Sequence, residues 1–308
     1  MPRRQVRSVS PVRACPVPWR QPGHPALQVQ SRLQSGEFRL QSCDGTASSY
    51  HLSVPASDYL LQFTSLGNPV ARTTVSGAAA AGYRVSRSGG DAWALSPEEL
   101  ALNPADILNA ASFSARLGAG GIISIFGSGL PLAATATSSV QLDGQPTPIF
   151  FSNGFQLNTV IPSDIIAGQH SLRLRSPYGD VSVPLDLGEV APGIFLLDAR
   201  RSAAVLNQDG SVSSSTNPAV RGQATVIFAT GLGSVTRQAN GLSTTTRPVS
   251  VLLSGRELDP FFSGLAPGFI GLYQLNVTIP IAAPPGIDQV LMLRVGEVES
   301  NVGLIAVR

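Results

Sequence analysis

The chain has 308 residues, enough for about two domains of ordinary size. Only 13% of its residues are charged, and all 21 basic residues are arginine. The absence of lysine excludes a P-loop, whose lysine contacts the phosphates, and any mechanism that uses a lysine Schiff base or a lysine general base.

The charge is unevenly distributed. Residues 1–40 contain seven arginines and one acid, whereas the remainder contains 14 arginines and 18 acids. The body of the protein is therefore mildly acidic and lacks the basic face that binding to nucleic acid requires, so no nucleic-acid partner is expected. Because the arginines of residues 1–24 are mixed with prolines, we expect a disordered leader there.

Neither a secretory signal nor a transmembrane segment is visible. The first 25 residues lack the apolar run of about 7–15 residues that a signal peptide needs. The longest uncharged stretch, residues 117–142, contains five glycines and a proline, which is typical of strands and turns and not of a membrane-spanning helix.

Residues 25–95 are predicted to form a small β region, either a small sandwich or the remnant of an upstream module. Phe38 and Tyr50 lie in strand-like segments on either side of a turn at residues 43–45 and predict a hairpin. Tyr83 and Trp93 predict a second hairpin across the glycines of residues 88–90.

Residues 96–108 are predicted to form a short helical linker. Ser96 has the character of a capping residue, Pro97 suits the first helical position, and Glu99 is the acid expected three residues after the cap. A helix from Pro97 to about Leu102 would end before the proline at position 104 and separate two domains.

Beyond the linker the apolar residues alternate with polar ones, which indicates half-buried strands. Turn sequences separate these strands at short intervals, for example Asp143-Gly144, Asp209-Gly210 and Ser254-Gly255. Many short strands with regular turns of this kind predict an antiparallel β-sandwich.

Three collinear blocks reveal an internal repeat. Residues 125–130 match 227–232, residues 140–152 match 251–263, and residues 156–162 match 274–280, with insertions of nine and seven residues between the blocks of the second copy. The repeat predicts two immunoglobulin-like β-sandwich units, at residues 109–198 and 199–308. We expect Phe126 and Phe228 to occupy equivalent positions in the two cores.

These blocks also resemble a known family. The segments NAASF, IFGSGL, QLNTVIP, PGIF, AVLNQDGSVSSSTNPA, FATGLG and GLAPGFIGLYQLNVTIP, spread over about residues 106–308, resemble the uncharacterised C-terminal domain family first described in Solibacter-type acidobacterial proteins. The resemblance implies an all-β fold of tandem IPT/TIG-like units at the end of a large secreted or cell-surface bacterial protein. It supplies no catalytic residues.

The function expected from the resemblance is a non-catalytic structural or adhesive module, outside the cell or on its surface, with a protein or polysaccharide surface as its partner. The chain departs from the family's usual setting because no export signal and no long upstream module precede the repeat units. This departure suggests a misplaced start or a fragment.

The two Gln-Leu-Asn motifs are the most distinctive polar feature. Alternation places Tyr273 on the apolar face of its strand and places Gln274 and Asn276 on the opposite face, as it does for Gln156 and Asn158 in the first copy. One interpretation is a carbohydrate-binding accessory module in which these amides bind a sugar and Tyr273 or Phe269 stacks on it. The other is that the amides satisfy backbone groups of nearby loops.

Candidates for catalysis or for metal binding are weak. Gly127-Ser128-Gly129 lacks the spacing of a nucleophile elbow, and His24, His51 and His170 provide no triad, so no enzyme is predicted. Cys15 and Cys43 could form a disulfide or remain free thiols; with His24 and His51 they match no usual zinc spacing, so neither a metal nor a cofactor is predicted. Residues 207–211 are expected to form an Asx-type turn and not a calcium loop.

Overall fold

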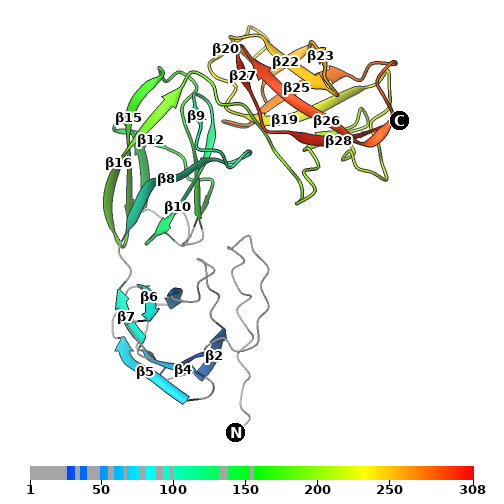
Figure 1. Cartoon of the computed structure of the whole chain (residues 1–308). Coiled ribbons are helices and arrows are strands. Elements are labelled where there is room, and N and C mark those ends of the chain that lie inside the picture. The colour runs from blue at the N-terminus through cyan, green and yellow to red at the C-terminus, as the bar shows by residue number, and fades with distance from the viewer. Residues whose placement is uncertain are drawn as a thin grey trace. The chain divides into compact units, whose positions relative to one another are not determined.

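The structure is a computed structural model, and none of its described residues is helical (Figure 1). It describes the backbone pairing of the strands between residues 26 and 97, and then the backbone and side chains of residues 100–131, 138–152 and 156–308, except for the side chain of Ser128. Within these ranges no helix could cross a membrane. The chain divides into two compact units, one of residues 1–101, 128–130 and 177–179 and the other of the remaining residues.

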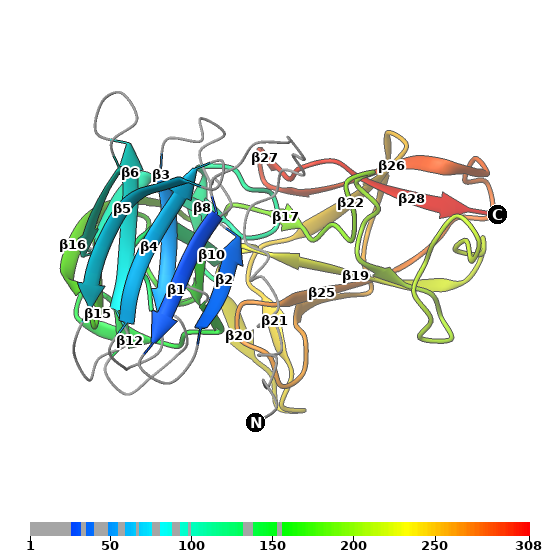
Figure 2. The same ribbon diagram turned by 90° about the horizontal axis from the view of Figure 1, so that it is seen from below.

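The strands between residues 26 and 97 form two antiparallel sheets, with the orders β2-β1-β4-β5 and β3-β6-β7. Figure 2 shows the four strands of the first sheet side by side. The strands are β1 (Ala26–Ser31), β2 (Ser35–Arg39), β3 (Ser49–Val54), β4 (Tyr59–Ser65), β5 (Asn68–Val75), β6 (Ala81–Arg87) and β7 (Trp93–Pro97).

One of the two predicted hairpins in this region is confirmed. β6 and β7 pair with Val85 opposite Leu95 and Arg87 opposite Trp93. The prediction of a hairpin around residues 43–45 was wrong, because β2 pairs with β1 while β3 pairs with β6 in the other sheet. Strand alternation is readable from a sequence, whereas the choice between two possible partners depends on tertiary packing.

The prediction of a helical linker at residues 96–108 was also wrong. Pro97 is the last residue of β7, and β8 (Ala101–Asn109) is a strand that neighbours β10 (Ile122–Ser128). In β8, Ile107 and Asn109 are buried and the residue between them is half-buried, which is a strand period and not a helical one. Sheet pairing here overrides the local capping signal, which is only a weak determinant of structure.

Two sheets form the first sandwich, with the orders β13-β14-β10-β8 and β12-β11-β15-β16-β9. β9 runs parallel to β16, whereas β14 is antiparallel to β10 and to β13, and β11 is antiparallel to β12 and to β15. Besides β8 and β10, the strands are β9 (Leu117–Gly118), β11 (Ser139–Leu142), β12 (Gln145–Thr147), β13 (Phe151–Ser152), β14 (Gln156–Val160), β15 (Gly168–Ser176) and β16 (Gly179–Gly188).

The second sandwich also has two sheets. One has the order β17-β19-β25-β24-β21-β20 with β18 beside β19, and the other has the order β23-β22-β26-β27 with β28 beside β26. Its strands are β17 (Gly193–Ile194), β18 (Val205–Leu206), β19 (Ala224–Thr230), β20 (Val235–Arg237), β21 (Ser243–Thr245), β22 (Val249–Leu253), β23 (Arg256–Leu258), β24 (Phe262–Leu265), β25 (Tyr273–Thr278), β26 (Gly286–Val295), β27 (Val298–Glu299) and β28 (Gly303–Val307).

The chain is thus a tandem of immunoglobulin-like β-sandwiches preceded by a smaller β region. β17 pairs with β19, so the second sandwich begins before residue 199, the boundary expected from the sequence. The apolar residues between its two sheets form one core. Figure 2 shows β19 and β25, the central strands of one of its sheets, side by side.

The repeat found in the sequence is a repeat of strand register. In the first sandwich Phe126 pairs with Gln156, and in the second Phe228 pairs with Gln274. The two phenylalanines are therefore equivalent, as predicted, but the prediction that they lie in the cores was wrong. Both are half-buried, because the preceding residues, Ile125 and Ile227, point inward and are 0% and 1% exposed.

The hairpins that follow β11 and β22 use the turn sequences recognised in each repeat. Asp143 and Gly144 have φ values of 49° and 81°, and Ser254 and Gly255 have values of 48° and 81°. Two successive positive φ angles define the type I′ turn, whose twist matches that of a two-residue β-hairpin. The prediction of turns at both sites is confirmed.

Buried hydrogen bonds connect the two sandwiches within the second compact unit; we refer to them as the joint. The amide of Ile122 donates to Thr230 Oγ1 at 2.7 Å, and this hydroxyl donates to the carbonyl of Gly271 at 2.7 Å. Gly233 N–H donates to Ala119 O at 3.1 Å. Thr230 is fully buried, so water does not compete for these bonds.

The joint also involves the segment between the sandwiches and the loop between β24 and β25, which contains the seven-residue insertion of the second repeat. Asn109 Nδ2 donates to Ala191 O at 2.9 Å, and Ala191 N–H donates to Gly231 O at 2.8 Å. Gly271 lies in the seven-residue insertion, and a Cβ atom there would meet Val160 and Ile122 of the first sandwich at 2.6 and 2.8 Å. The insertion of the second copy therefore contributes to the joint.

Candidate functional site

The outward face of β19, β25 and β24 brings together the amide pair predicted from the sequence and two aromatic rings. Directly paired residues share a face of the sheet. Phe228 is paired with Gln274, and Phe262 with Asn276. All four side chains are half-buried, so each has an accessible surface as well as packed neighbours.

The two amides are fixed relative to each other. Gln274 Nε2 donates to Asn276 Oδ1 at 2.8 Å, a bond between residues i and i+2 on one face of one strand. We call these two side chains the amide couple. The interpretation that such amides satisfy loop backbone groups does not describe this pair, because each amide is bonded to the other.

The first sandwich contains an equivalent pair. Gln156 Nε2 donates to Asn158 Oδ1, also at 2.8 Å, and Phe126 and Phe151 occupy the positions of Phe228 and Phe262. The amide pairs were predicted, but the aromatic partners were missed. Their signal was present in the repeat blocks, which align these phenylalanines; the strand pairing that puts them beside the amides is not visible in the sequence.

The suggestion that Tyr273 stacks on a ligand was wrong. Tyr273 is 0% exposed, and its hydroxyl donates a hydrogen bond to Gly233 O. Burial raises its pKa. Phe269, the other suggested platform, is 60% exposed at the tip of the loop between β24 and β25, and its contact with a ligand stays a prediction.

An Asp–His pair that the sequence interpretation missed lies at the end of the first sandwich. His170 Nδ1 lies 2.5 Å from Asp143 Oδ2, and Nε2 lies 2.8 Å from Ile166 O. Since both ring nitrogens face acceptors, the doubly protonated ring is favoured. The hydrogen bond with Asp143 raises the pKa of His170, and the same bond lowers the pKa of Asp143.

This pair does not have the geometry of a catalytic dyad. In a serine triad the ring nitrogen remote from the aspartate accepts the proton of the nucleophile. Here that nitrogen, Nε2, faces the carbonyl of Ile166. The second oxygen of Asp143 accepts from the amide of Ser171 at 2.8 Å. The pair therefore ties the β11–β12 turn to the start of β15.

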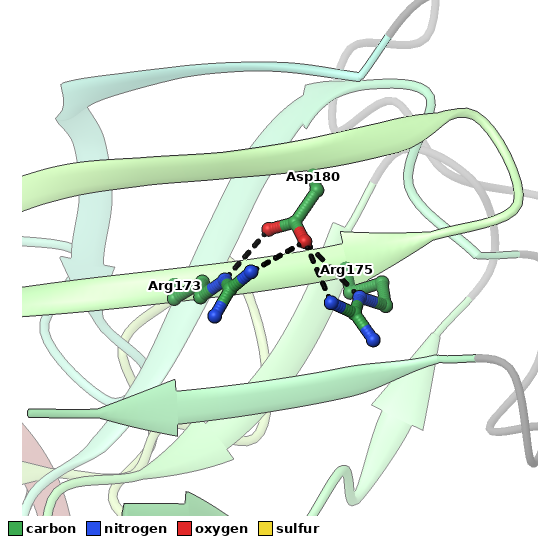
Figure 3. A network of polar contacts seen from close by, with 3 residues as sticks. All are labelled: Arg173, Arg175 and Asp180. Atoms are coloured by element: carbon green, nitrogen blue, oxygen red, sulfur yellow. Dashed lines mark hydrogen bonds and ion pairs between the residues drawn. The ribbon is translucent and has the colours of Figure 1, made fainter. Parts of the chain in front are cut away.

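A second charged group is a three-residue cluster on β15 and β16 (Figure 3). Arg173 donates to both carboxylate oxygens of Asp180 at 2.8 Å, and Arg175 donates to Oδ2 at 3.0 and 3.1 Å. The hydrogen bond from Arg173, aided by that from Arg175, lowers the pKa of Asp180 to about 2. All three side chains are partly exposed, so the cluster contributes little to stability.

The loop that was expected to form an Asx-type turn does so. Ser211 N–H donates to Asp209 Oδ1 at 2.9 Å, and Gly210 N–H donates to Asn207 O at 2.9 Å. Two polar atoms in and next to this loop, Asn207 Oδ1 and Ser213 Oγ, are buried without a hydrogen-bond partner in the described part of the chain.

The remaining candidates lie largely outside the described part of the chain. Cys15, His24 and Cys43 fall on residues that are not described, and of His51 only its backbone place in β3 is described. Within the described ranges no three His, Cys, Asp or Glu side chains gather as a metal site would require.

No protein-family model matches the chain, and no curated protein matches it significantly. Among solved structures, it is similar to SGBP-B of the Bacteroides ovatus mixed-linkage glucan utilization locus, solved in complex with a mixed-linkage heptasaccharide. The identity is 9% and the TM-score 0.27, over 92% of this chain and 60% of that one. This chain therefore spans less than two thirds of that protein's length.

Two further structures are similar to a comparable degree. The I9–I11 tandem of titin has 10% identity and a TM-score of 0.20, over 91% of this chain and 87% of that one. Domains 4–9 of the surface layer protein SbsC have 12% identity and a TM-score of 0.25, over 91% of this chain and 47% of that one. At these identities and TM-scores the likeness says nothing about what this chain binds.

Proposed function

We propose that the chain is a non-catalytic structural module of a secreted or cell-surface bacterial protein, in which the two sandwiches act as one mechanical unit. The observation that supports the proposal best is the joint. Thr230 accepts a hydrogen bond from Ile122 of the first sandwich and donates one to Gly271 of the second. A flexible linker between independent domains would not need buried polar groups that match each other in this way.

The polar chemistry of the described residues agrees with a structural role. The bonds of His170 and Asp143 are all made to groups within the first sandwich. The acids of the charged clusters are paired with arginines, as Asp180 is with Arg173. The placement outside the cell comes from the sequence resemblance to the acidobacterial C-terminal domain family.

Spin-label distances test the mechanical part of the proposal. Labels are placed by Asp186→Cys on β16 and Arg256→Cys on β23, both exposed positions, in the full chain with Cys15→Ser and Cys43→Ser. We expect one narrow distance distribution. Thr230→Val should broaden it, because Ile122 N–H and Gly271 O lose their buried partner.

A matched control uses the same substitution away from the joint. Thr225 is equally buried, and its hydroxyl donates to Val277 O within the second sandwich at 3.3 Å. Thr225→Val should leave the distance distribution narrow. A broad distribution in the parent protein would show that the sandwiches move independently and would overturn the proposal.

Protease treatment of intact source cells tests the location. An antibody raised against residues 199–308 should detect the protein in the medium or in the surface fraction, and external protease should remove the signal. A signal that survives external protease and is lost only after lysis would overturn the extracellular assignment.

A further inference from the structure

The amide couple of the second sandwich retains one acceptor and one donor for a ligand. The bond between Gln274 Nε2 and Asn276 Oδ1 leaves Gln274 Oε1 and Asn276 Nδ2 without a hydrogen-bond partner among the described residues. If both amides were rotated by 180°, one free donor and one free acceptor would still remain. A sugar hydroxyl both donates and accepts, so neighbouring hydroxyls of a sugar ring match this pair.

The residues of β19, β24 and β25 that share the outward face with the couple are uncharged. By register, the outward residues of the three strands are Ala224, Val226, Phe228, Phe262, Gly264, Gln274, Asn276 and Thr278. An anionic or cationic ligand would lose its hydration shell here without meeting an opposite charge. The composition of the surface therefore favours a neutral ligand.

The surface also lies away from any free strand edge. β25 pairs with β19 on one side and with β24 on the other, and both of these strands have further neighbours. An extended peptide that binds by adding a strand needs an unpaired edge. A ligand at this surface must be recognised by side chains, as a sugar is.

Two aromatic rings flank the couple. Phe228 is paired with Gln274 on β19, and Phe262 is paired with Asn276 on β24. Gly264 pairs with Gln274, and a Cβ atom on Gly264 would lie 3.0 Å from Phe262 Cζ. The ring of Phe262 therefore extends along the sheet toward Gln274. Apolar ring faces beside a few placed polar groups are the usual composition of a small-molecule site.

We infer that the outward face of β19, β25 and β24 binds a neutral polysaccharide. The amide couple bonds to hydroxyl groups of one sugar residue, and Phe228 and Phe262 contact the apolar faces of sugar rings. The inference goes beyond the structural role and does not depend on the joint, so either can fail while the other holds.

The first sandwich provides an internal comparison. There Gln156 Nε2 also donates to Ser124 Oγ at 3.2 Å, and Ser124 is 1% exposed. The equivalent position in the second sandwich is Val226, which is half-buried and makes no such bond. The side chain of Gln156 is thus committed to its own sheet, and we assign the binding site to the second sandwich alone.

Affinity electrophoresis of the full chain tests the inference. The gels contain one neutral polysaccharide each: mixed-linkage β-glucan, xyloglucan, galactomannan or dextran, with the anionic alginate as a further gel. We expect at least one neutral polymer to retard the protein. Gln274→Leu and Phe262→Ala should each weaken the retardation about tenfold, since each removes a contact worth about 1.4 kcal/mol, whereas Gln156→Leu should leave it unchanged.

Folding is checked separately. Each variant should retain a cooperative thermal transition. Gln274→Glu has nearly the same shape as the parent side chain but places a charge on the neutral surface, so it should also weaken the retardation. Retardation by none of the neutral polymers, by alginate alone, or an equal loss in Gln156→Leu and Gln274→Leu would overturn the inference.

Discussion

The hydroxyl of Tyr273 donates a hydrogen bond to the carbonyl oxygen of Gly233, and no part of the tyrosine is exposed. A Cβ atom on Gly120, in the first sandwich, would lie 1.8 Å from the same hydroxyl. Gly120 has a φ of 71° and so occupies a conformation that favours glycine. The side chain of Tyr273 therefore extends from the core of the second sandwich to the joint, where its hydroxyl lies.

The first prediction concerns this hydroxyl. Tyr273→Phe should lower the free energy of unfolding by about 1–3 kcal/mol, because Gly233 O loses its buried donor while the ring still fills the core. Tyr273→Ala should cost more, about 3–5 kcal/mol, because it also leaves a cavity. Urea denaturation measures both values, and an unchanged free energy of unfolding in Tyr273→Phe would contradict the role given to the hydroxyl.

The raised pKa of Tyr273 has a consequence at alkaline pH. A folded-state pKa above the unfolded value of about 10 means that the stabilisation is complete below that value and is lost as the pH rises above it. The decline in stability above pH 10 should therefore be smaller in Tyr273→Phe than in the parent protein. Parallel declines would show that other groups cause the effect.

The second prediction tests which residues of β19 form the core. Ile227→Ala should lower the free energy of unfolding by about 2–5 kcal/mol, since Ile227 is 1% exposed between the two sheets. Phe228→Ala should cost less, because Phe228 is half-buried on the outward face. A larger loss for Phe228 in thermal unfolding would place that ring inward and contradict the register.

The one-residue difference between Ile227 and Phe228 shows how far the sequence could predict this fold. Alternation identified the strands and the repeat identified equivalent positions, but both residues are apolar, so the pattern did not say which of them points inward. Similarly, Ser96 and Pro97 carry the local signals of a helix start, whereas β8 forms because it pairs with β10. Long-range pairing decided both cases.

The third prediction concerns Asp180. Its carboxylate should titrate with a pKa of about 2, measured by NMR of the side-chain carbon. Since a lowered pKa in the folded state stabilises the protein above the unfolded value, this contribution is present at neutral pH and is lost as the pH falls from the usual aspartate pKa of 3.8 toward 2.

Substituting each arginine in turn shows how much each one lowers the pKa of Asp180. Arg173→Gln should raise the pKa of Asp180 more than Arg175→Gln, because Arg173 bonds to both carboxylate oxygens. Arg294→Gln, which breaks a similar strand-to-strand pair with Glu299 in the second sandwich, is the control and should not move it. A larger shift from Arg175→Gln would contradict the geometry of the cluster.

Only part of the candidate site could be predicted from the sequence, again because strand pairing is not visible in it. Gln274 and Asn276 lie in one strand, and their common face follows from a period of two. Phe228 and Phe262 are 46 and 12 residues away from Gln274 in sequence, and only the pairing of three strands brings them beside it. Tyr273 was misjudged because its environment at the joint depends on Gly120 and Gly233, which no local pattern connects to it.

The last prediction concerns Ser213, whose buried hydroxyl meets no hydrogen-bond partner among the residues that the structure describes. Burial of an unpaired hydroxyl is unfavourable, so Ser213→Ala should raise the free energy of unfolding by about 1 kcal/mol, which is about 2–4 °C in melting temperature for a domain of this size. Ser300→Ala is the matched control and should destabilise, since Ser300 Oγ accepts from Leu293 N–H at 2.9 Å and donates to Asn301 O at 2.7 Å. A loss of stability in Ser213→Ala would mean that the hydroxyl is hydrogen-bonded in solution and would contradict the prediction.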